Sequence, residues 1–286
     1  MYLPLVVGVD GSEPSLRAVD WAADEAFLHR LPLLVLFASR WERYEGDALA
    51  HELGKPSERV LADDILRVAA GRARLRHRDL AVTSETVPDE AEHALVCAGR
   101  NASMIVLGSR GRSGFADRLL GSVCRAVAAG SDCPVVVLRG DHDNRAVGGR
   151  RDGLVVGVGE ASASVLRFAF TEARLRRVPL TAVRAWRCPA PETIDHPLLT
   201  GEPARLYEER AAKELEAALE DTPADITVRR HTAEGPARRV LPAASAEADL
   251  LAVGRHTHAK LGRVTHTVLH RSSCPVVIVP ERPRER

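Results

Sequence analysis

The feature that most constrains the fold of this chain is that its sequence repeats once. Four segments of the first half return, in the same order, in the second half. The matching pairs are LVVGVDGS (5–12) with LVVGVGEA (154–161), RLPLLVLFASRW (30–41) with RVPLTAVRAWRC (177–188), MIVLG (104–108) with LLAVG (250–254), and SDCPVVVLRG (131–140) with SSCPVVIVPE (272–281). This order predicts two copies of one domain in tandem. We place them at 1–140 and 154–286, with a polar, glycine-rich linker at 141–153.

Each copy alternates short apolar runs with amphipathic segments. In the first copy the apolar runs predict strands at 3–9, 33–38, 80–87, 104–107 and 135–138. The amphipathic segments predict helices at 12–28, 58–76, 88–98 and 123–129. Apolar strands that alternate with helices are typical of a parallel sheet covered on both faces. We therefore expect the α/β class, with two Rossmann-like domains that each contain a five-stranded, mostly parallel sheet.

A glycine-rich stretch follows the fourth predicted strand of the first copy, in MIVLGSRGRSGFADRLLGSV (104–123). Glycine lets a ligand approach main-chain N–H groups closely, and successive N–H groups form a cradle for phosphate oxygens. The helix that opens at Gly121 and Ser122 adds unpaired N–H donors and the positive end of its dipole. No Lys follows this Gly-Ser pair and the glycines do not have the dinucleotide spacing, so neither of those two motifs applies.

Four positions far apart in the sequence fall at the ends of predicted strands: Asp10, Ala38, Val87 and Gly108. Ligands of open α/β sheets bind at the carboxyl ends of strands, where the strand order reverses. We therefore expect these positions to converge. Asp10 suits a ligand contact, a helix N-cap, or both, whereas Val87 equally suits the core.

The spacing Gly108-x2-Gly111-x9-Gly121-Ser122, with VLGSRG before it and CPVVVL after it, resembles the nucleotide-binding motif of the universal stress protein family. VVGVDGSEPSLRAVDWA near the N-terminus resembles the opening strand of that family, and the likeness covers nearly the whole chain. The resemblance implies a fold of the adenine nucleotide alpha-hydrolase type, bound ATP with or without Mg²⁺, stress-linked regulation and packing of domains through edge strands.

The resemblance also implies which residues of the first copy hold the nucleotide. Asp10 would face the sugar or the base, the Ala38 backbone would pair with adenine, and Val87 would line the adenine pocket. Arg118 equally suits a solvated position on a helix. The full implied set is Gly8, Asp10, Ala38, Val87, Gly108, Ser109, Arg110, Gly111, Arg112, Ser113, Gly114, Arg118, Gly121, Ser122 and Val123. No carboxylate cluster with ligand spacing supports a dedicated metal site.

The second copy lacks much of this pattern. Gly159 stands where the first copy has Asp10, and Arg263 replaces Ser122. The loop between Gly254 and Gly262 is also shorter than its counterpart. We therefore expect the second copy to bind ATP poorly or not at all, and to act as a structural partner or to bind another anion through Arg255, Lys260 and Arg263. Two of its histidines, His266 and His270, have a helical spacing that can ligate metal, although solvated histidines are the commoner case.

Composition excludes several classes of function. Lys plus Arg number 40 and Asp plus Glu 39, so a net charge of +1 argues against a nucleic-acid or anionic-membrane partner. The five cysteines form no C-x-x-C pair, and we interpret them as buried residues in a reducing compartment. With no signal-peptide pattern and no long apolar span, we expect a cytoplasmic protein.

The sequence leaves three functions open. The first is an ATP-binding regulator or sensor with no catalytic residues and slow ATP hydrolysis at most. The second is a nucleotide-dependent enzyme, a weak ATPase or a nucleotidyl transferase, although no signature of such transferases accompanies the first strand. The third is a scaffold that binds no nucleotide. A homodimer and an unidentified protein partner are compatible with each of the three.

Overall fold

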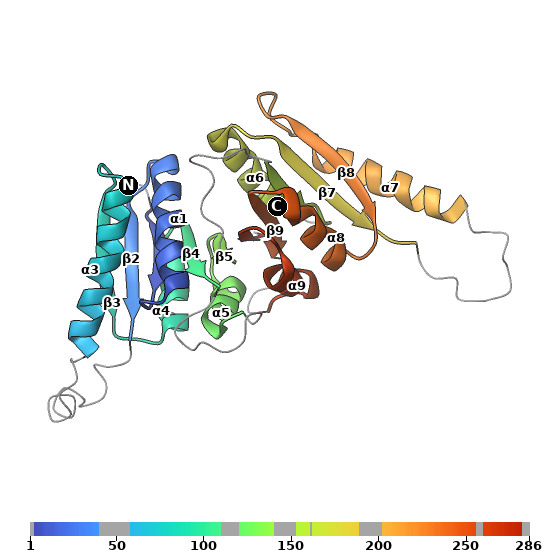
Figure 1. Ribbon diagram of the computed structural model, residues 1–286. Coiled ribbons are helices and arrows are strands. Elements are labelled where there is room, and N and C mark those ends of the chain that lie inside the picture. Colours follow the sequence, from blue (N-terminus) through green and yellow to red (C-terminus); the bar gives the residue numbers. More distant parts are fainter. Residues whose placement is uncertain are drawn as a thin grey trace. The chain divides into compact units, whose positions relative to one another are not determined.

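The structure is a computed structural model that describes residues 3–39, 58–109, 120–139, 153–160, 162–188, 202–255 and 260–281. The chain divides into two compact units, shown from blue to green and from yellow to red in Figure 1. The first unit comprises Met1–Gly149 with Thr257–Leu261, and the second comprises Arg150–His256 with Gly262–Arg286. The predicted linker at 141–153 lies almost wholly outside the described residues, so its bounds stay a prediction.

The first unit alternates strands and helices. Its elements are, in chain order, β1 (Leu5–Val9), α1 (Glu13–His29), β2 (Leu33–Ala38), α3 (Glu58–Arg76), β3 (Val82–Val87), α4 (Ala91–Ala98), the 3-10 turn η2 (Gly99–Asn101), β4 (Met104–Gly108), α5 (Ser122–Gly130) and β5 (Val135–Leu138). The strands lie in the order β3-β2-β1-β4-β5, and each neighbouring pair is parallel. The strand order therefore reverses between β1 and β4.

The second unit repeats this arrangement. Its elements are β6 (Leu154–Gly157), α6 (Ala163–Arg176), β7 (Leu180–Trp186), α7 (Glu202–Ala218), β8 (Val228–Glu234), α8 (Ala237–Ala244), the 3-10 turn η5 (Ser245–Glu247), β9 (Leu250–Arg255), α9 (Arg263–Arg271) and β10 (Val276–Pro280). The order β8-β7-β6-β9-β10, again parallel throughout, is the order of the first unit with each strand replaced by its counterpart. The predicted fold class is confirmed.

Helices cover both faces of the first sheet. A Cβ atom added to Gly8 would meet Leu95 of α4, and one added to Gly108 would meet Pro14 of α1. These two positions lie on opposite faces of the sheet. Continuing the β1–β4 register places Gly108 opposite Val9, and Val9 faces the other side from its neighbour Gly8 because side-chain directions alternate along a strand. One face is covered by α1, which packs against α3, and the other face is covered by α4, which packs against α5. No helix in the described part of the chain is both long and apolar enough to cross a membrane.

Three predicted boundaries were wrong by two or three residues. The first strand begins at Leu5 rather than Leu3, whose side chain is 48% exposed. The third strand begins at Val82 rather than Leu80. The Leu80 N–H donates a hydrogen bond to the His77 carbonyl, so Leu80 still belongs to the turn that follows α3. The following helix begins at Ala91 rather than residue 88, because residues 87–89 form a turn first.

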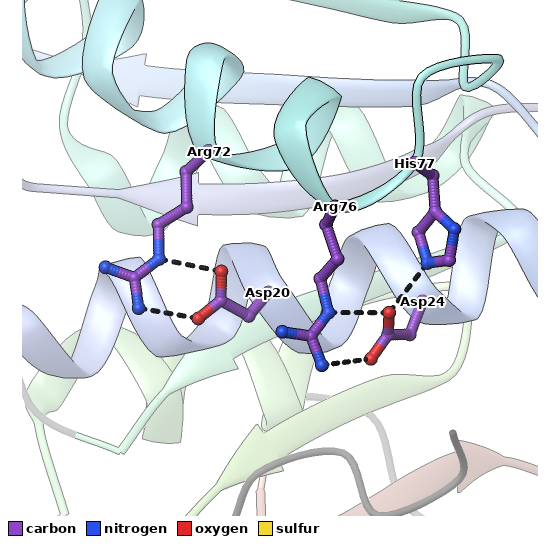
Figure 2. A network of polar contacts seen from close by, with 5 residues as sticks. All are labelled: Asp20, Asp24, Arg72, Arg76 and His77. Carbon is purple, nitrogen blue, oxygen red and sulfur yellow. Dashed lines mark hydrogen bonds and ion pairs between the residues drawn. The ribbon is translucent and has the colours of Figure 1, made fainter. Parts of the chain in front are cut away.

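A network of ion pairs joins α1 to α3 in the first unit (Figure 2). The Arg72 guanidinium donates two bonds to the Asp20 carboxylate, at 2.7 and 2.6 Å, and Arg76 binds Asp24 in the same way, at 2.6 and 2.8 Å. His77 Nε2 lies 2.7 Å from Asp24 Oδ1, and the Asp24 side chain is only 2% exposed. The second unit has Arg167 and Thr171 at the corresponding positions of α6, so this network belongs to the first unit.

The cysteines do not form the uniformly buried group that composition predicts. Cys124, Cys133 and Cys274 are buried, as expected, and burial raises the pKa of each thiol. Cys97 and Cys188 are only partly buried, so the interpretation of those two was wrong. Cys97 lies near the end of the short helix α4 and Cys188 follows β7, and both places are near the surface.

Candidate functional site

The candidate site lies where the strand order of the first unit reverses. β1 pairs with β2 on one side and with β4 on the other, and β4 continues to β5. The chain leaves β1 at Asp10 and β4 at Ser109, so these residues follow neighbouring strands at the same edge of the sheet. This is the edge at which open α/β sheets bind ligands.

Asp10 supports the start of α1. Its Oδ1 accepts bonds from the Ser12 N–H at 3.0 Å and from the Ser12 hydroxyl at 2.6 Å. Ser12 is the N-cap, because its side-chain oxygen accepts the Ser15 N–H. The interpretation of Asp10 as the N-cap was therefore wrong, since Asp10 orients the cap from outside the helix.

A buried thiol fixes the start of α5 beside the end of β4. The Cys124 Sγ donates a bond to the Gly108 carbonyl oxygen at 2.8 Å. Burial, together with the negative charge of Asp10, raises the pKa of Cys124 to about 12, so the thiol keeps its proton at neutral pH. Sequence reasoning missed Cys124, although its place in the first turn after the Gly-Ser pair could have identified it.

The two ends of the glycine-rich loop are joined by hydrogen bonds. The Gly121 N–H donates to the Ser109 carbonyl at 3.1 Å, and the Ser109 N–H donates to the Leu138 carbonyl at 2.9 Å. The loop therefore starts and ends at fixed points of the sheet edge. The remaining predicted phosphate-binding residues lie outside the described residues and stay predictions; they are Arg110, Gly111, Arg112, Ser113, Gly114 and Arg118.

The first turn of α5 has no side-chain cap. Gly121 is the N-cap with φ −60° and ψ 152°, and no side chain of the described residues caps this end. The Arg125 N–H is the first to bond back to the Gly121 carbonyl, so the N–H groups of Ser122, Val123 and Cys124 precede the helical ladder. Ser122 is exposed. The positive end of this nine-residue helix therefore lies at Gly121, where the glycine-rich loop ends.

Two of the predicted glycines have a clear packing role. A Cβ atom at Gly108 would lie 2.5 Å from the Pro14 carbonyl oxygen, so only glycine lets β4 approach the first turn of α1 this closely. A Cβ atom at Gly8 would lie 2.7 Å from a methyl carbon of Leu107, and Leu95 is also close. Gly8 therefore makes room for the core, and its role toward a ligand stays a prediction.

Ala38 and Val87 lie on the same edge as Asp10, at the ends of β2 and β3. They are register partners, and the Ser39 N–H donates to the Val87 carbonyl at 3.0 Å. Val87 is only partly buried, on a strand that pairs with β2 alone among the described strands, so the core interpretation of this residue was wrong. Because β2 adjoins β1, Ala38 lies one strand away from Asp10 and Val87 two.

Side chains of the second unit occupy the corresponding edge. Arg184, on β7, donates a bond to the Gly159 carbonyl at 3.1 Å and also pairs with Glu214. The Glu281 carboxylate, just after β10, accepts the N–H groups of Ser164 at 2.9 Å and Val165 at 3.1 Å. Neither residue was singled out from the sequence, because their partners are far away along the chain.

The second unit also differs at its glycine-rich loop. Gly262 caps α9 with φ −63° and ψ 161°, the same backbone as Gly121, but Arg263 follows it in place of Ser122. The rings of His266 and His270 lie 4.4 Å apart at a tilt of 40°. Among the cations proposed for another anion, Arg255 is buried whereas Lys260 and Arg263 are exposed.

Comparisons with known proteins agree with the fold and with the duplication. The model of the universal stress protein family matches twice, at 1–139 and 152–280. A universal stress protein of Mycobacterium tuberculosis is 30% identical over 299 residues, which cover 96% of each chain. The crystal structure of a universal stress protein from Archaeoglobus fulgidus covers 98% of both chains, with 20% identity and a TM-score of 0.69.

A further universal stress protein has been solved in complex with cAMP. It is 32% identical, covers 48% of this chain and has a TM-score of 0.37, and a likeness of that extent carries no argument about the ligand of this chain. The two family matches and the Mycobacterium relative span both halves. The chain therefore belongs to the universal stress protein family and contains two copies of the family's domain.

Proposed function

We propose that the first unit binds ATP at the carboxyl ends of β1 and β4, and that the protein is a stress-response regulator which responds to this nucleotide. The observation that carries the proposal is the uncapped first turn of α5, held beside Asp10 by the bond between Cys124 and the Gly108 carbonyl. Three main-chain N–H groups and a positive helix end meet there at the point where the strand order reverses.

The donors suit phosphate oxygens. A helix N-terminus stabilises a nearby anion by about 0.3–1 kcal/mol in exposed positions and by more in partly buried ones. Three adjacent N–H groups with fixed directions add hydrogen bonds that need no rearrangement on binding, because the loop ends are already joined. The described residues therefore fit a phosphate group, with the exposed Ser122 hydroxyl as a further donor.

Asp10 fits the sugar or the base. A carboxylate accepts hydrogen bonds from ribose hydroxyl or adenine amino groups. Its bonds to Ser12 hold the side chain in one orientation at the edge of the sheet, so the carboxylate is positioned before the ligand arrives. Ala38 and Val87 lie along the same edge, where the base would contact the ends of β2 and β3.

The second unit is proposed to be a structural partner that does not bind ATP. Glu281 places a negative charge against the first turn of α6, and Arg184 covers the carbonyl of Gly159. A triphosphate there would have to displace bonds that the chain already makes, and the Glu281 carboxylate would repel it. ATP thus acts as a ligand that shifts the first unit between states, with slow hydrolysis at most.

The test uses two glycines with nearly the same backbone. The two variants are Gly121→Val and Gly262→Val. The backbone at both positions can accommodate valine, because each glycine has φ near −60° and an extended ψ. Isothermal titration of the nucleotide-stripped full chain with ATP, with and without Mg²⁺, should give one site. We expect Gly121→Val to weaken binding about tenfold or more, since the side chain crowds donors that each contribute about 1 kcal/mol.

Gly262→Val should leave ATP affinity unchanged, because no atom lies within 4 Å of a Cβ at that position. Absence of heat with ATP, or an equal loss in both variants, would contradict the proposal. Product analysis after long incubation then separates a binder from the alternative nucleotide-dependent enzyme. A scaffold that binds no nucleotide would fail the titration itself.

A further inference from the structure

A row of three polar side chains runs along α4, outside the candidate nucleotide site. Asp89 precedes the helix, His93 lies one turn into it and Cys97 lies near its end, so the three are spaced four residues apart. The His93 Nδ1 contacts the Asp89 carboxylate, and the His93 Nε2 lies 3.5 Å from the Cys97 Sγ. The imidazole therefore bridges a carboxylate and a thiol.

This order of contacts determines the tautomer of the histidine. A carboxylate accepts but does not donate, so the neutral ring places its proton on Nδ1, toward Asp89. The Nε2 atom is then an acceptor and faces the thiol of Cys97. A nucleophile, a base and a group that orients the base is the arrangement that activates thiols in general.

Accessibility distinguishes Cys97 from the three buried cysteines. The His93 side chain is 66% exposed and Cys97 is partly exposed, whereas Cys124, Cys133 and Cys274 are buried. A reagent in solution can therefore reach the pair of His93 and Cys97. The dipole of α4 disfavours a thiolate at the helix end, so a local proton acceptor is needed for reactivity.

The second unit shows that the fold does not require these residues. Helix α8 corresponds to α4, and it has Gly235, Arg239 and Ala243 at the three positions. Arg239 cannot accept a proton and Ala243 offers no thiol. The row on α4 is thus an addition to a helix that packs in the same place without it.

We propose that Cys97 is a redox modification site that reacts with low-molecular-weight disulfides. The Cys97 thiol transfers its proton to the His93 Nε2, and Asp89 stabilises the imidazolium that forms. The thiolate attacks one sulfur of the disulfide, so a bond between Cys97 and that sulfur forms while the original S–S bond breaks. The second sulfur leaves as a thiolate and takes up the proton from His93.

This reaction conserves electrons within the exchange. The Cys97 sulfur is oxidised to a mixed disulfide, and half of the small disulfide is reduced to a free thiol. The charged residues around α4 are Glu90 at its N-cap, Glu92 in its first turn and Arg100 in the following turn, and α5, which packs against α4, contributes Arg125. Their charges are mixed, so we assign the activation to His93.

The experiment measures mixed-disulfide formation with oxidised glutathione at pH 7 on the reduced full chain. Peptide mass spectrometry resolves the rate at Cys97 from the rate at Cys188, the other partly exposed cysteine. We expect Cys97 to react about tenfold faster than Cys188, and His93→Gln to slow it about tenfold. Asp89→Asn should slow it less, because the imidazole stays in place.

Cys188→Ser is the matched control and should leave the rate at Cys97 unchanged. Far-ultraviolet circular dichroism verifies that the variants fold, as expected for exposed positions. Equal rates at Cys97 and Cys188, or a rate at Cys97 that does not change in His93→Gln, would overturn the proposal. These results are independent of ATP binding, so the two proposals fail separately.

Discussion

The two units have the same strand order, and in both the helix after the fourth strand starts at a glycine without a side-chain cap among the described residues, so the units differ in the side chains beside that edge. In the first unit the start of α5 has no side-chain cap among the described residues, and Asp10 lies beside it at the same edge. In the second unit Arg184 and Glu281 bond to the corresponding edge and to the start of α6. The comparison teaches that the fold creates main-chain donors at this edge in both copies, while the side chains that lie against the edge differ between them.

The largest expected difference between the units concerns the helix pair in Figure 2. Asp24→Ala removes a buried carboxylate that binds both Arg76 and His77, and we expect it to lower the free energy of unfolding by about 3 kcal/mol. Thr171→Ala at the matching position of α6 should cost less than about 1 kcal/mol. Urea unfolding monitored by circular dichroism measures both changes.

Comparable losses in the two variants would show that the ion-pair network contributes little. A loss in Asp24→Ala that Arg76→Ala largely reproduces would show that the Arg76–Asp24 pair carries most of the effect. Arg72→Ala tests the neighbouring, more exposed pair with Asp20 and should have a smaller effect.

The next prediction uses the thiol that holds α5. Cys124 has its pKa raised from 9.0 to about 12 in the folded protein, so between these values the folded state binds more protons than the unfolded state. Stability due to this group is therefore complete below about pH 9 and is lost as the pH rises toward 12, by about 1.4 kcal/mol per unit. Urea unfolding at several alkaline pH values measures the slope.

Cys124→Thr isolates this contribution, because the second unit has Thr265 at the same position and a hydroxyl does not titrate in this range. We expect a shallower alkaline slope in this variant than in the natural protein. The pKa of Cys274 is also raised to about 12, and this thiol should keep its own contribution in the variant. Identical slopes in both proteins would contradict the assignment.

The smallest expected effect concerns the helix starts. Glu281→Ala removes the acceptor of two N–H groups of α6, and Ser12→Ala removes the cap of α1. Each should lower the free energy of unfolding by about 1 kcal/mol. Thermal unfolding of the two variants measures both changes in stability. A loss of stability confined to Ser12→Ala would show that Glu281 does not cap α6 in solution.

Much of the fold could be predicted from the sequence, because long periodic segments specify their own element. Helix α3 and strand β5 have the predicted bounds, Glu58–Arg76 and Val135–Leu138. Boundaries near turns were less predictable, as at Leu3 and Leu80, because a few hydrogen bonds decide them. Within the candidate site, the sequence placed Asp10 and Gly108 at one edge, but the link through Cys124 depends on a contact across 16 residues.

The sequence by itself determined that the chain is a tandem repeat of an α/β domain and that the second copy differs at Gly159 and Arg263. Only the tertiary structure decided that Ser12 caps α1, that Arg184 and Glu281 occupy the second edge, and that His93 links Asp89 to Cys97. The physical reason is range. Hydrophobic period and turn residues act between neighbours along the chain, whereas a hydrogen bond depends on the distance and direction of two atoms that the fold brings together.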